Sequence, residues 1–219
     1  MERILARGTF PIAPEGRKRE TEWWVAYHVP AVVDADGDGA PEVLLAGGSY
    51  LTALLRKDGT PVWHTDYVSG KGARPMQGIG DVDGDGRIEV GSCEPGQGFV
   101  CLDGATGELR WTWDSADARP SSIATCDVDG DGLEEFLVPT EKDLVAINGK
   151  GGAANVVWRM ALPGPCREVV AADVDGDGDL DIASGRNWYE APDWKKQADF
   201  RDGAETNGPE TDDNSEFAM

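Results

Sequence analysis

The sequence predicts an all-β protein built from about four repeats of one four-stranded unit. An acidic motif, DVDGDG or the near-copy DADGDG, begins at residues 34, 81, 127 and 173 of the 219, at intervals of 47, 46 and 46 residues. A second marker has nearly the same interval, because Trp63, Trp111 and Trp158 lie 48 and 47 residues apart. Two markers in phase indicate a repeat protein.

Four short strands are expected within each repeat. In the second repeat, PMQGIG (75–80) precedes the acidic motif, RIEVGS (87–92) leaves it, and GFVCLD (98–103) and GELRWTWD (107–114) follow. The first and third repeats have the same order, and no window of a dozen residues has the apolar periodicity of a helix. Four strands in roughly 46 residues match one blade of a β-propeller.

These intervals place a single repeat domain over residues 1–219. The expected divisions are the end of a preceding blade with an incoming strand (1–26), blade 1 (27–73), blade 2 (74–119), blade 3 (120–165), blade 4 (166–200), and an acidic loop that starts a further blade (201–219). The fourth repeat departs from the pattern, because DLDIASGRNWYEAPDW has no Gly-containing turn before a Trp at the expected place. The sequence ends where the interval predicts a fifth motif, so we expect an incomplete propeller: part of a longer one, or a half that pairs with a second copy.

The acidic motifs have the composition of calcium-binding loops. Carboxylates occupy motif positions 1, 3, 5 and 9, Gly occupies positions 4 and 6, and position 7 would contribute a backbone carbonyl. Oxygen ligands in a Gly-containing loop suit a hard cation with a flexible shell, which favours Ca²⁺ over Mg²⁺. Without a metal the clustered carboxylates would repel one another. The candidate ligands of up to four Ca²⁺ ions are Asp34, Asp36, Asp38, Ala40 and Glu42; Asp81, Asp83, Asp85, Arg87 and Glu89; Asp127, Asp129, Asp131, Leu133 and Glu135; and Asp173, Asp175, Asp177, Asp179 and Asp181.

An EF-hand is excluded, because its loop needs a bidentate Glu at position 12. That position holds Leu45, Ser92, Val138 and Ser184 in the four motifs. The pattern D-x-D-G-D-G-x-x-[DE] at a blade-length interval instead resembles the FG-GAP and VCBS repeats, a family that includes the calcium-binding blades of integrin α-subunit propellers. The resemblance covers about residues 20–200, and it implies that the loop joins the first two strands of a blade and binds calcium through positions 1, 3, 5, 7 and 9. The Phe-Gly and Gly-Ala-Pro elements of the family are not recognisable, so the chain is placed nearer to VCBS proteins than to integrins.

A second resemblance is local. CLDGATGELRW, from Cys101 to Trp111, is similar to the tryptophan-docking motif of PQQ-type propellers, which implies that the Trp packs between neighbouring blades. The first and third repeats keep only DG or NG and the Trp, so no bound quinone is expected. Cys93 and Cys101 could face each other across a hairpin, although buried thiols explain the four cysteines better.

The net charge of -21 disfavours nucleic acids and anionic membrane surfaces as partners. No stretch approaches the roughly 20 apolar residues of a membrane span, and no secretory signal is recognisable at the start of the sequence. Calcium-binding modules of modest affinity need the high calcium concentration found outside the cytosol, which predicts an extracellular, periplasmic or cell-surface location. The expected partners are calcium and a protein or carbohydrate ligand, and open blade edges would allow self-association.

No catalytic motif is recognisable, and His28 and His64, the two histidines, are better explained as packed or surface residues. We therefore expect a non-catalytic module for binding or adhesion. The alternative is part of a calcium-dependent polysaccharide-degrading enzyme such as a rhamnogalacturonan lyase. In that case aromatic side chains could stack on sugar rings, although packing within or between blades is the simpler explanation. The residues concerned are Trp23, Trp24, Trp188 and Tyr189.

Overall fold

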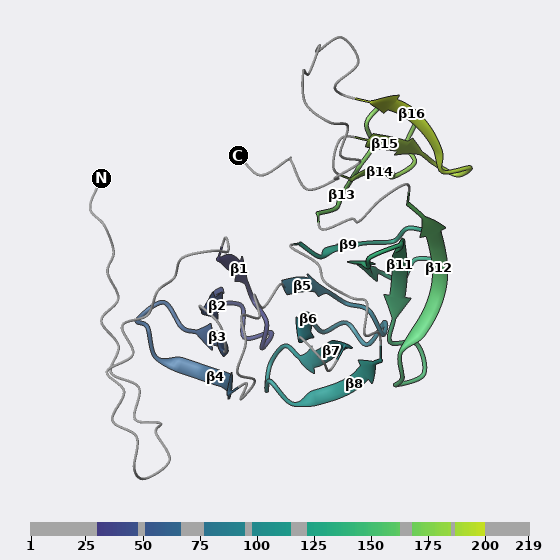
Figure 1. Cartoon of the computed structure of the whole chain (residues 1–219). Coiled ribbons are helices and arrows are strands. Elements are labelled where there is room, and N and C mark those ends of the chain that lie inside the picture. The colour runs from purple at the N-terminus through teal and green to yellow at the C-terminus, as the bar shows by residue number, and fades with distance from the viewer. Residues whose placement is uncertain are drawn as a thin grey trace, which may run out of the picture.

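The computed structural model describes residues 30–47, 51–66, 77–94, 98–114, 122–162, 168–184 and 187–199. Over these ranges the regular secondary structure consists of four antiparallel four-stranded sheets, which confirms the predicted all-β class and the four-stranded unit. The sheets, here called blades 1 to 4, follow one another along an open arc (Figure 1). None of the described residues forms a helix that could cross a membrane.

Within each blade the strands lie side by side in chain order. The strands are β1 (Ala31–Val33), β2 (Glu42–Gly47), β3 (Leu51–Leu55) and β4 (Pro61–Asp66) in blade 1; β5 (Gln77–Gly80), β6 (Glu89–Glu94), β7 (Gly98–Asp103) and β8 (Leu109–Trp113) in blade 2; β9 (Ala124–Cys126), β10 (Glu135–Pro139), β11 (Asp143–Asn148) and β12 (Asn155–Ala161) in blade 3; and β13 (Val170–Ala172), β14 (Asp181–Ser184), β15 (Asn187–Glu190) and β16 (Lys195–Asp199) in blade 4. The first strand of each blade faces the inside of the arc, where β9 lies against β5 and β13 (Figure 1).

The second strand of a blade begins later than the sequence pattern predicts. We expected a strand from Arg87, but β6 begins at Glu89. The reason is local, because the backbone N–H of Arg87 donates to Oδ1 of Asp85 at 2.9 Å and so still belongs to the acidic loop. Leu133 donates to Asp131 in the same way at 2.9 Å, and β10 correspondingly begins at Glu135.

The apolar core is divided into three clusters, and each lies between two successive blades. In β10, the fully buried Phe136 and Val138 belong to the cluster shared with blade 2, whereas Leu137 between them belongs to the cluster shared with blade 4. Side chains alternate between the two faces of a strand, so both faces of this blade are covered by its neighbours. Stacking of blades therefore supplies the core that one sheet cannot form alone.

Tryptophan side chains join consecutive blades. Nε1 of Trp63 in blade 1 donates to the carbonyl oxygen of Gly104 in the β7–β8 turn at 2.7 Å. A Cβ atom placed on Gly107 of the same turn would lie 2.6 Å from the Trp63 indole. Trp111 lies equally close to Gly149 of blade 3, where an added Cβ would be 2.7 Å from its Nε1. These glycines leave room for the indole of the preceding blade.

Blade 4 makes this contact differently. Trp158 of blade 3 meets Trp194 edge to face, with ring centroids 4.9 Å apart. Trp194 ends the turn between β15 and β16 and has a φ of 54°, a left-handed value that glycine supplies in the turns of blades 1 and 2. A ring–ring contact thus replaces the ring–glycine contact, which explains the missing Gly-containing turn in the fourth repeat.

Gly107→Ala is expected to lower the free energy of unfolding by about 3 kcal/mol, because the new methyl group would be strained and would collide with Trp63. Gly59→Ala is the matched control, since Gly59 has a φ of +83° in the corresponding turn of blade 1 with open space around it. Strain alone should cost that variant about 1 kcal/mol. Urea denaturation of both variants measures the difference, and equal losses would contradict the docking of Trp63 on this turn.

Candidate functional site

Each acidic motif forms the connection between the first two strands of a blade. The four loops cover residues 34–41, 81–88, 127–134 and 173–180, and the carboxylate at motif position 9 is the first residue of the following strand. The four loops therefore occupy equivalent places along the arc.

Asp81, at position 1, folds the second loop by accepting two hydrogen bonds. Its Oδ1 accepts from the N–H of Gly84 at 2.8 Å, and its Oδ2 accepts from the N–H of Gly86 at 2.9 Å. Gly84 and Gly86 have φ values of +78° and +83°, which other residues adopt only with strain, so glycine is required at positions 4 and 6. Asp34 and Asp173 make both corresponding bonds in blades 1 and 4.

Asp83 and Asp85, at positions 3 and 5, each use one oxygen in the same way. Oδ1 of Asp83 accepts from the N–H of Asp85 at 3.1 Å, and Oδ1 of Asp85 accepts from the N–H of Arg87 at 2.9 Å. These bonds recur in the other three loops. In blade 2 the Oδ2 atoms of both aspartates are left facing basic nitrogen atoms.

The position 9 carboxylates are buried. One oxygen of each accepts the backbone N–H of position 2 in its own loop, at 3.2, 3.1, 3.1 and 2.9 Å from blade 1 to blade 4. This bond turns the carboxylate back toward the loop. The exposed fractions are 2% for Glu42, 0% for Glu89, 0% for Glu135 and 1% for Asp181.

The second oxygen of the position 9 carboxylate differs between blades. Asn148 donates to Oε1 of Glu135 at 3.0 Å, and the N–H of Ala191 donates to Oδ1 of Asp181 at 3.0 Å. Oε1 of Glu89, in contrast, is buried without a hydrogen-bond donor, as is Oδ1 of Asp127. A buried anionic oxygen without a partner is costly, and a cation beside it would remove that cost.

Carboxylate oxygens converge in every loop, so that three acids each place one oxygen within 4.8 Å of the other two. The sets are Asp34, Asp36 and Glu42; Asp81, Asp83 and Asp85; Asp127, Asp129 and Glu135; Asp173, Asp175 and Asp181; and Asp175, Asp177 and Glu190. Positions 1 and 3 thus meet in all four loops. Asp38, Glu89 and Asp131 lie outside these sets. Position 7 lies near the end of each loop, where Ala40, Arg87 and Asp179 are exposed and Leu133 is buried.

Sequence reasoning missed Glu190. It ends β15 and lies across from Asp181, next along the ladder from the Ile182–Tyr189 pair. The motif contains no signal for it, because strand pairing brings a residue outside the loop to this place. A register prediction for the second and third strands of each blade would have been needed to find it.

Burial raises the pKa of Glu89 and Glu135 from 4.5 to about 7. The nearby aspartates raise both values further, whereas the N–H groups of Val82 and Val128, which donate to these carboxylates, oppose the shift. A positive ion bound to the loop would favour the charged form of both groups.

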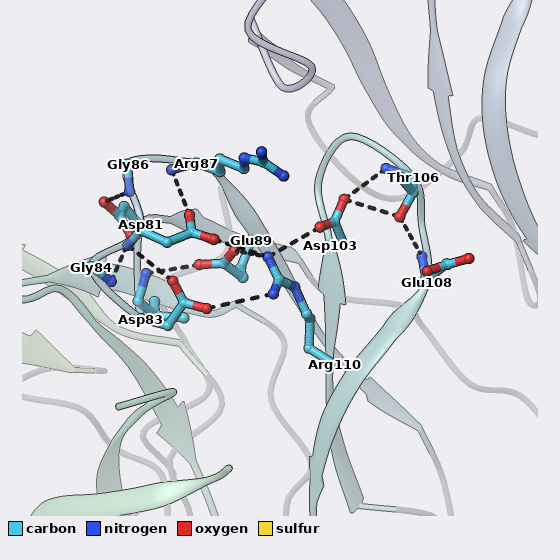
Figure 2. A network of polar contacts seen from close by, with 12 residues as sticks. Asp81, Asp83, Gly84, Gly86, Arg87, Glu89, Asp103, Thr106, Glu108 and Arg110 are labelled. Carbon is cyan, nitrogen blue, oxygen red and sulfur yellow. Dashed lines mark hydrogen bonds and ion pairs between the residues drawn. The ribbon is translucent and has the colours of Figure 1, made fainter. Parts of the chain in front are cut away.

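Basic side chains approach three of the loops. Arg56, after β3, lies 3.8 Å from Asp36, and Lys150, after β11, lies 3.3 Å from Asp131. Arg110 of β8 reaches between the second loop and the β7–β8 turn (Figure 2).

The remaining candidates from the sequence are mostly part of the packing or lie outside the described residues. Cys101 and Cys126 are buried free thiols, so the alternative of a disulfide between Cys93 and Cys101 is wrong. Burial raises the pKa of Cys126 to about 12, which leaves its thiol protonated. Tyr189 is 4% exposed within the cluster of blades 3 and 4, which fits packing rather than sugar stacking, and Trp188 is half-buried. His64 lies in β4, whereas Trp23, Trp24 and His28 lie outside the described residues.

Comparison with known proteins agrees with this architecture. Residues 81–138, which run from the second acidic loop through most of β10, match the model of the FG-GAP-like repeat. The rhamnogalacturonan lyase PL11 of Bacillus licheniformis has a similar structure, with a TM-score of 0.58 and 21% identity over 73% of this chain and 40% of the lyase. The chain therefore has the fold of a propeller-type repeat protein, and its residues 81–138 are similar to an FG-GAP-like repeat.

Two further solved structures share this arrangement of blades. They are the V. cholerae biofilm matrix protein Bap1, with a TM-score of 0.50 and 22% identity over 75% of this chain and 29% of that chain, and the dihydro-heme d1 dehydrogenase NirN, with a TM-score of 0.53 and 21% identity over 79% and 36%. The chain spans less than half the length of each of these three proteins, and its blades form an incomplete propeller. At these identities the likeness describes the fold alone. No curated protein sequence matches the chain.

Glu89 and Glu135 are expected to make the metal-free protein less stable as the pH rises from about 4.5 to about 7. Folded, they keep their protons up to about pH 7, whereas in the unfolded chain they lose them near 4.5. The folded state therefore binds more protons in this window, and its free energy of unfolding falls with rising pH. Urea titrations in chelator at several pH values would measure this effect as the difference between the wild type and the Glu89→Gln/Glu135→Gln variant. If the free energy of unfolding of the wild type and of the variant fell equally with rising pH, the buried carboxyl groups would not be the source of the effect.

Proposed function

We propose that this propeller-type module binds calcium, with up to four Ca²⁺ ions, one in each acidic loop. The observation that carries the proposal is the convergence of carboxylate oxygens at the same place in all four blades. Two oxygens that bind one Ca²⁺ ion at about 2.4 Å can lie up to about 4.8 Å apart, so each three-acid set can share an ion. The proposed ligands are the residues at positions 1, 3, 5, 7 and 9 of each motif.

Oxygens that take no part in the turns of the loop fit this cation. In the second loop positions 3 and 5 form the turns through Oδ1, so their Oδ2 atoms accept no backbone N–H and face Arg110, whose positive charge a Ca²⁺ ion would replace. Glu89 and Asp127 each hold a buried oxygen without a hydrogen-bond donor, and a bound cation would give that oxygen a partner. The donor set is made of oxygen alone, which suits Ca²⁺ and excludes metals that prefer sulfur or nitrogen.

We infer further that the module acts outside the cytosol in non-catalytic binding of a protein or carbohydrate, as in adhesion. Loop sites of modest affinity fill at the calcium concentrations found outside cells, roughly 10⁻⁴ to 10⁻³ M. Carboxylates bound to calcium would not be free to act as a general acid or base. One structure with the same fold is a biofilm matrix protein, which supports such a role.

Calorimetric titration of the metal-free full chain with Ca²⁺ is expected to show up to four binding events. Asp83→Ala should remove one of them and lower the melting temperature by about 5 °C in calcium, because the second site no longer stabilises the folded state. In chelator the loss should be much smaller. Asp143→Ala is the control, since Asp143 pairs with Arg159 outside the loops. An equal loss of Asp83→Ala stability with and without calcium would count against a metal site.

A polysaccharide-degrading parent protein is the second candidate, because one structure with the same fold is a rhamnogalacturonan lyase. Incubation of the chain with rhamnogalacturonan in calcium tests it, since a lyase releases unsaturated products that absorb in the near ultraviolet. We expect no release. Product formation that stops with chelator and returns with calcium would replace the non-catalytic proposal.

A further inference from the structure

Arg110 is surrounded by carboxylates of blade 2. Its guanidinium nitrogen atoms lie 3.1 Å from Oδ2 of Asp103, 3.2 Å from Oδ2 of Asp85, 3.6 Å from Oε1 of Glu89 and 3.8 Å from Oδ2 of Asp83. Figure 2 shows the guanidinium between the acidic loop and the β7–β8 turn, reached from β8. One positive charge therefore lies close to two acids of the loop, to Glu89 at the start of β6 and to Asp103 at the end of β7.

Arg110 faces the oxygens that a metal would use. The turns of the loop use Oδ1 of Asp83 and Oδ1 of Asp85 as acceptors, so the Oδ2 atoms of both residues accept no backbone N–H. Oε1 of Glu89 is buried and has no hydrogen-bond donor, and Arg110 is the cation near it. A Ca²⁺ ion that takes these oxygens must displace or repel the guanidinium. The Arg110 side chain is 32% exposed, so a path into solvent is open to it.

The other blades lack this arrangement among the described contacts. Arg56 approaches one carboxylate of the first loop at 3.8 Å, and Lys150 approaches one carboxylate of the third loop at 3.3 Å. In blade 4 the third strand brings the acid Glu190 to the cluster of Asp175 and Asp177. Among the ion pairs of the described residues, the second loop is thus the one that places several carboxylates around a single basic side chain.

We propose that Arg110 is a tethered cation that stands in for calcium in blade 2. It holds the second loop folded without metal, and it lowers the calcium affinity of that loop by competing for the same oxygens. The competition rests on the proposed calcium sites, whereas the support of the metal-free loop does not. The four loops then differ in calcium affinity. As the calcium concentration rises, the second loop binds its ion after a loop that lacks such a cation.

The metal-free role is tested by melting Arg110→Met and Arg159→Met in chelator. Arg159 is the control, because it also lies on the fourth strand of a blade and, among the described residues, it pairs with one acid, Asp143, at 2.8 Å and outside the acidic loops. Arg110→Met should melt about 5 °C below Arg159→Met, since its loss leaves a cluster of acids uncompensated. Saturating calcium should close most of this gap. Equal melting temperatures in chelator overturn the proposal.

The competition is tested by calcium calorimetry of the full chain. Arg110→Met should raise the affinity of one site about tenfold, as expected when a unit charge near a divalent ion is removed. Arg110→Lys keeps the charge and should stay close to the wild type. In the Asp83→Ala background, which lacks the second site, Arg110→Met should leave the remaining isotherm unchanged.

The outcomes separate this inference from the proposed function. If calcium binds but Arg110→Met leaves every affinity unchanged, lowers one, or acts equally in the Asp83→Ala background, the competition is wrong and the calcium sites stand. If no calcium binds at all, the proposed function and the competition both fail. The melting comparison in chelator then still decides whether Arg110 supports the second loop.

Discussion

Carboxylate repulsion at the connection between the first two strands is the constraint on which each blade depends. Four acids must lie within one short loop, and the last of them is buried at the start of a strand. Hydrogen bonds from backbone N–H groups partly stabilise these carboxylates. In the second loop Asp81, Asp83 and Asp85 each accept at least one such bond, and the N–H of Val82 donates to Glu89. These bonds give the loop its shape, but they add no positive charge. The rest of the charge requires a cation, either a bound ion or a basic side chain.

The second loop is also part of the contact between blades 2 and 3. The N–H of Gly149 donates to the carbonyl oxygen of Val82 at 2.7 Å, and the N–H of Asp81 donates to Oε2 of Glu134 at 2.9 Å. Trp111 packs on the same Gly149. A change in the charge balance of this loop therefore reaches the neighbouring blade through hydrogen bonds as well as through the shared apolar cluster. The stability of one repeat therefore depends on the folding of its neighbour, as expected for stacked repeats.

Variation between blades concerns the residues that strand pairing brings to the loops. The residue across from position 9 in the third strand is Asp103 in blade 2, and by the same register it is Asn148 in blade 3 and Glu190 in blade 4. Asn148 satisfies the buried Glu135, whereas Asp103 adds a charge beside Glu89 and recruits Arg110. Loops of nearly identical sequence thus have different electrostatic surroundings.

The sequence by itself determined the repeat, the four strands of the first three units and the acids of each loop, because interval, alternation and motif are properties of neighbouring residues. β7 coincides with the predicted GFVCLD, whereas β6 starts two residues late because the side chain of Asp85 holds Arg87 in the loop. Only the tertiary structure decided that Trp194 replaces a glycine contact, that Glu190 joins the fourth loop and that Arg110 neutralises the second. These residues lie 13 to 36 positions from the loop acids or ring that they meet, and the contacts depend on strand register and blade stacking, which no local pattern encodes.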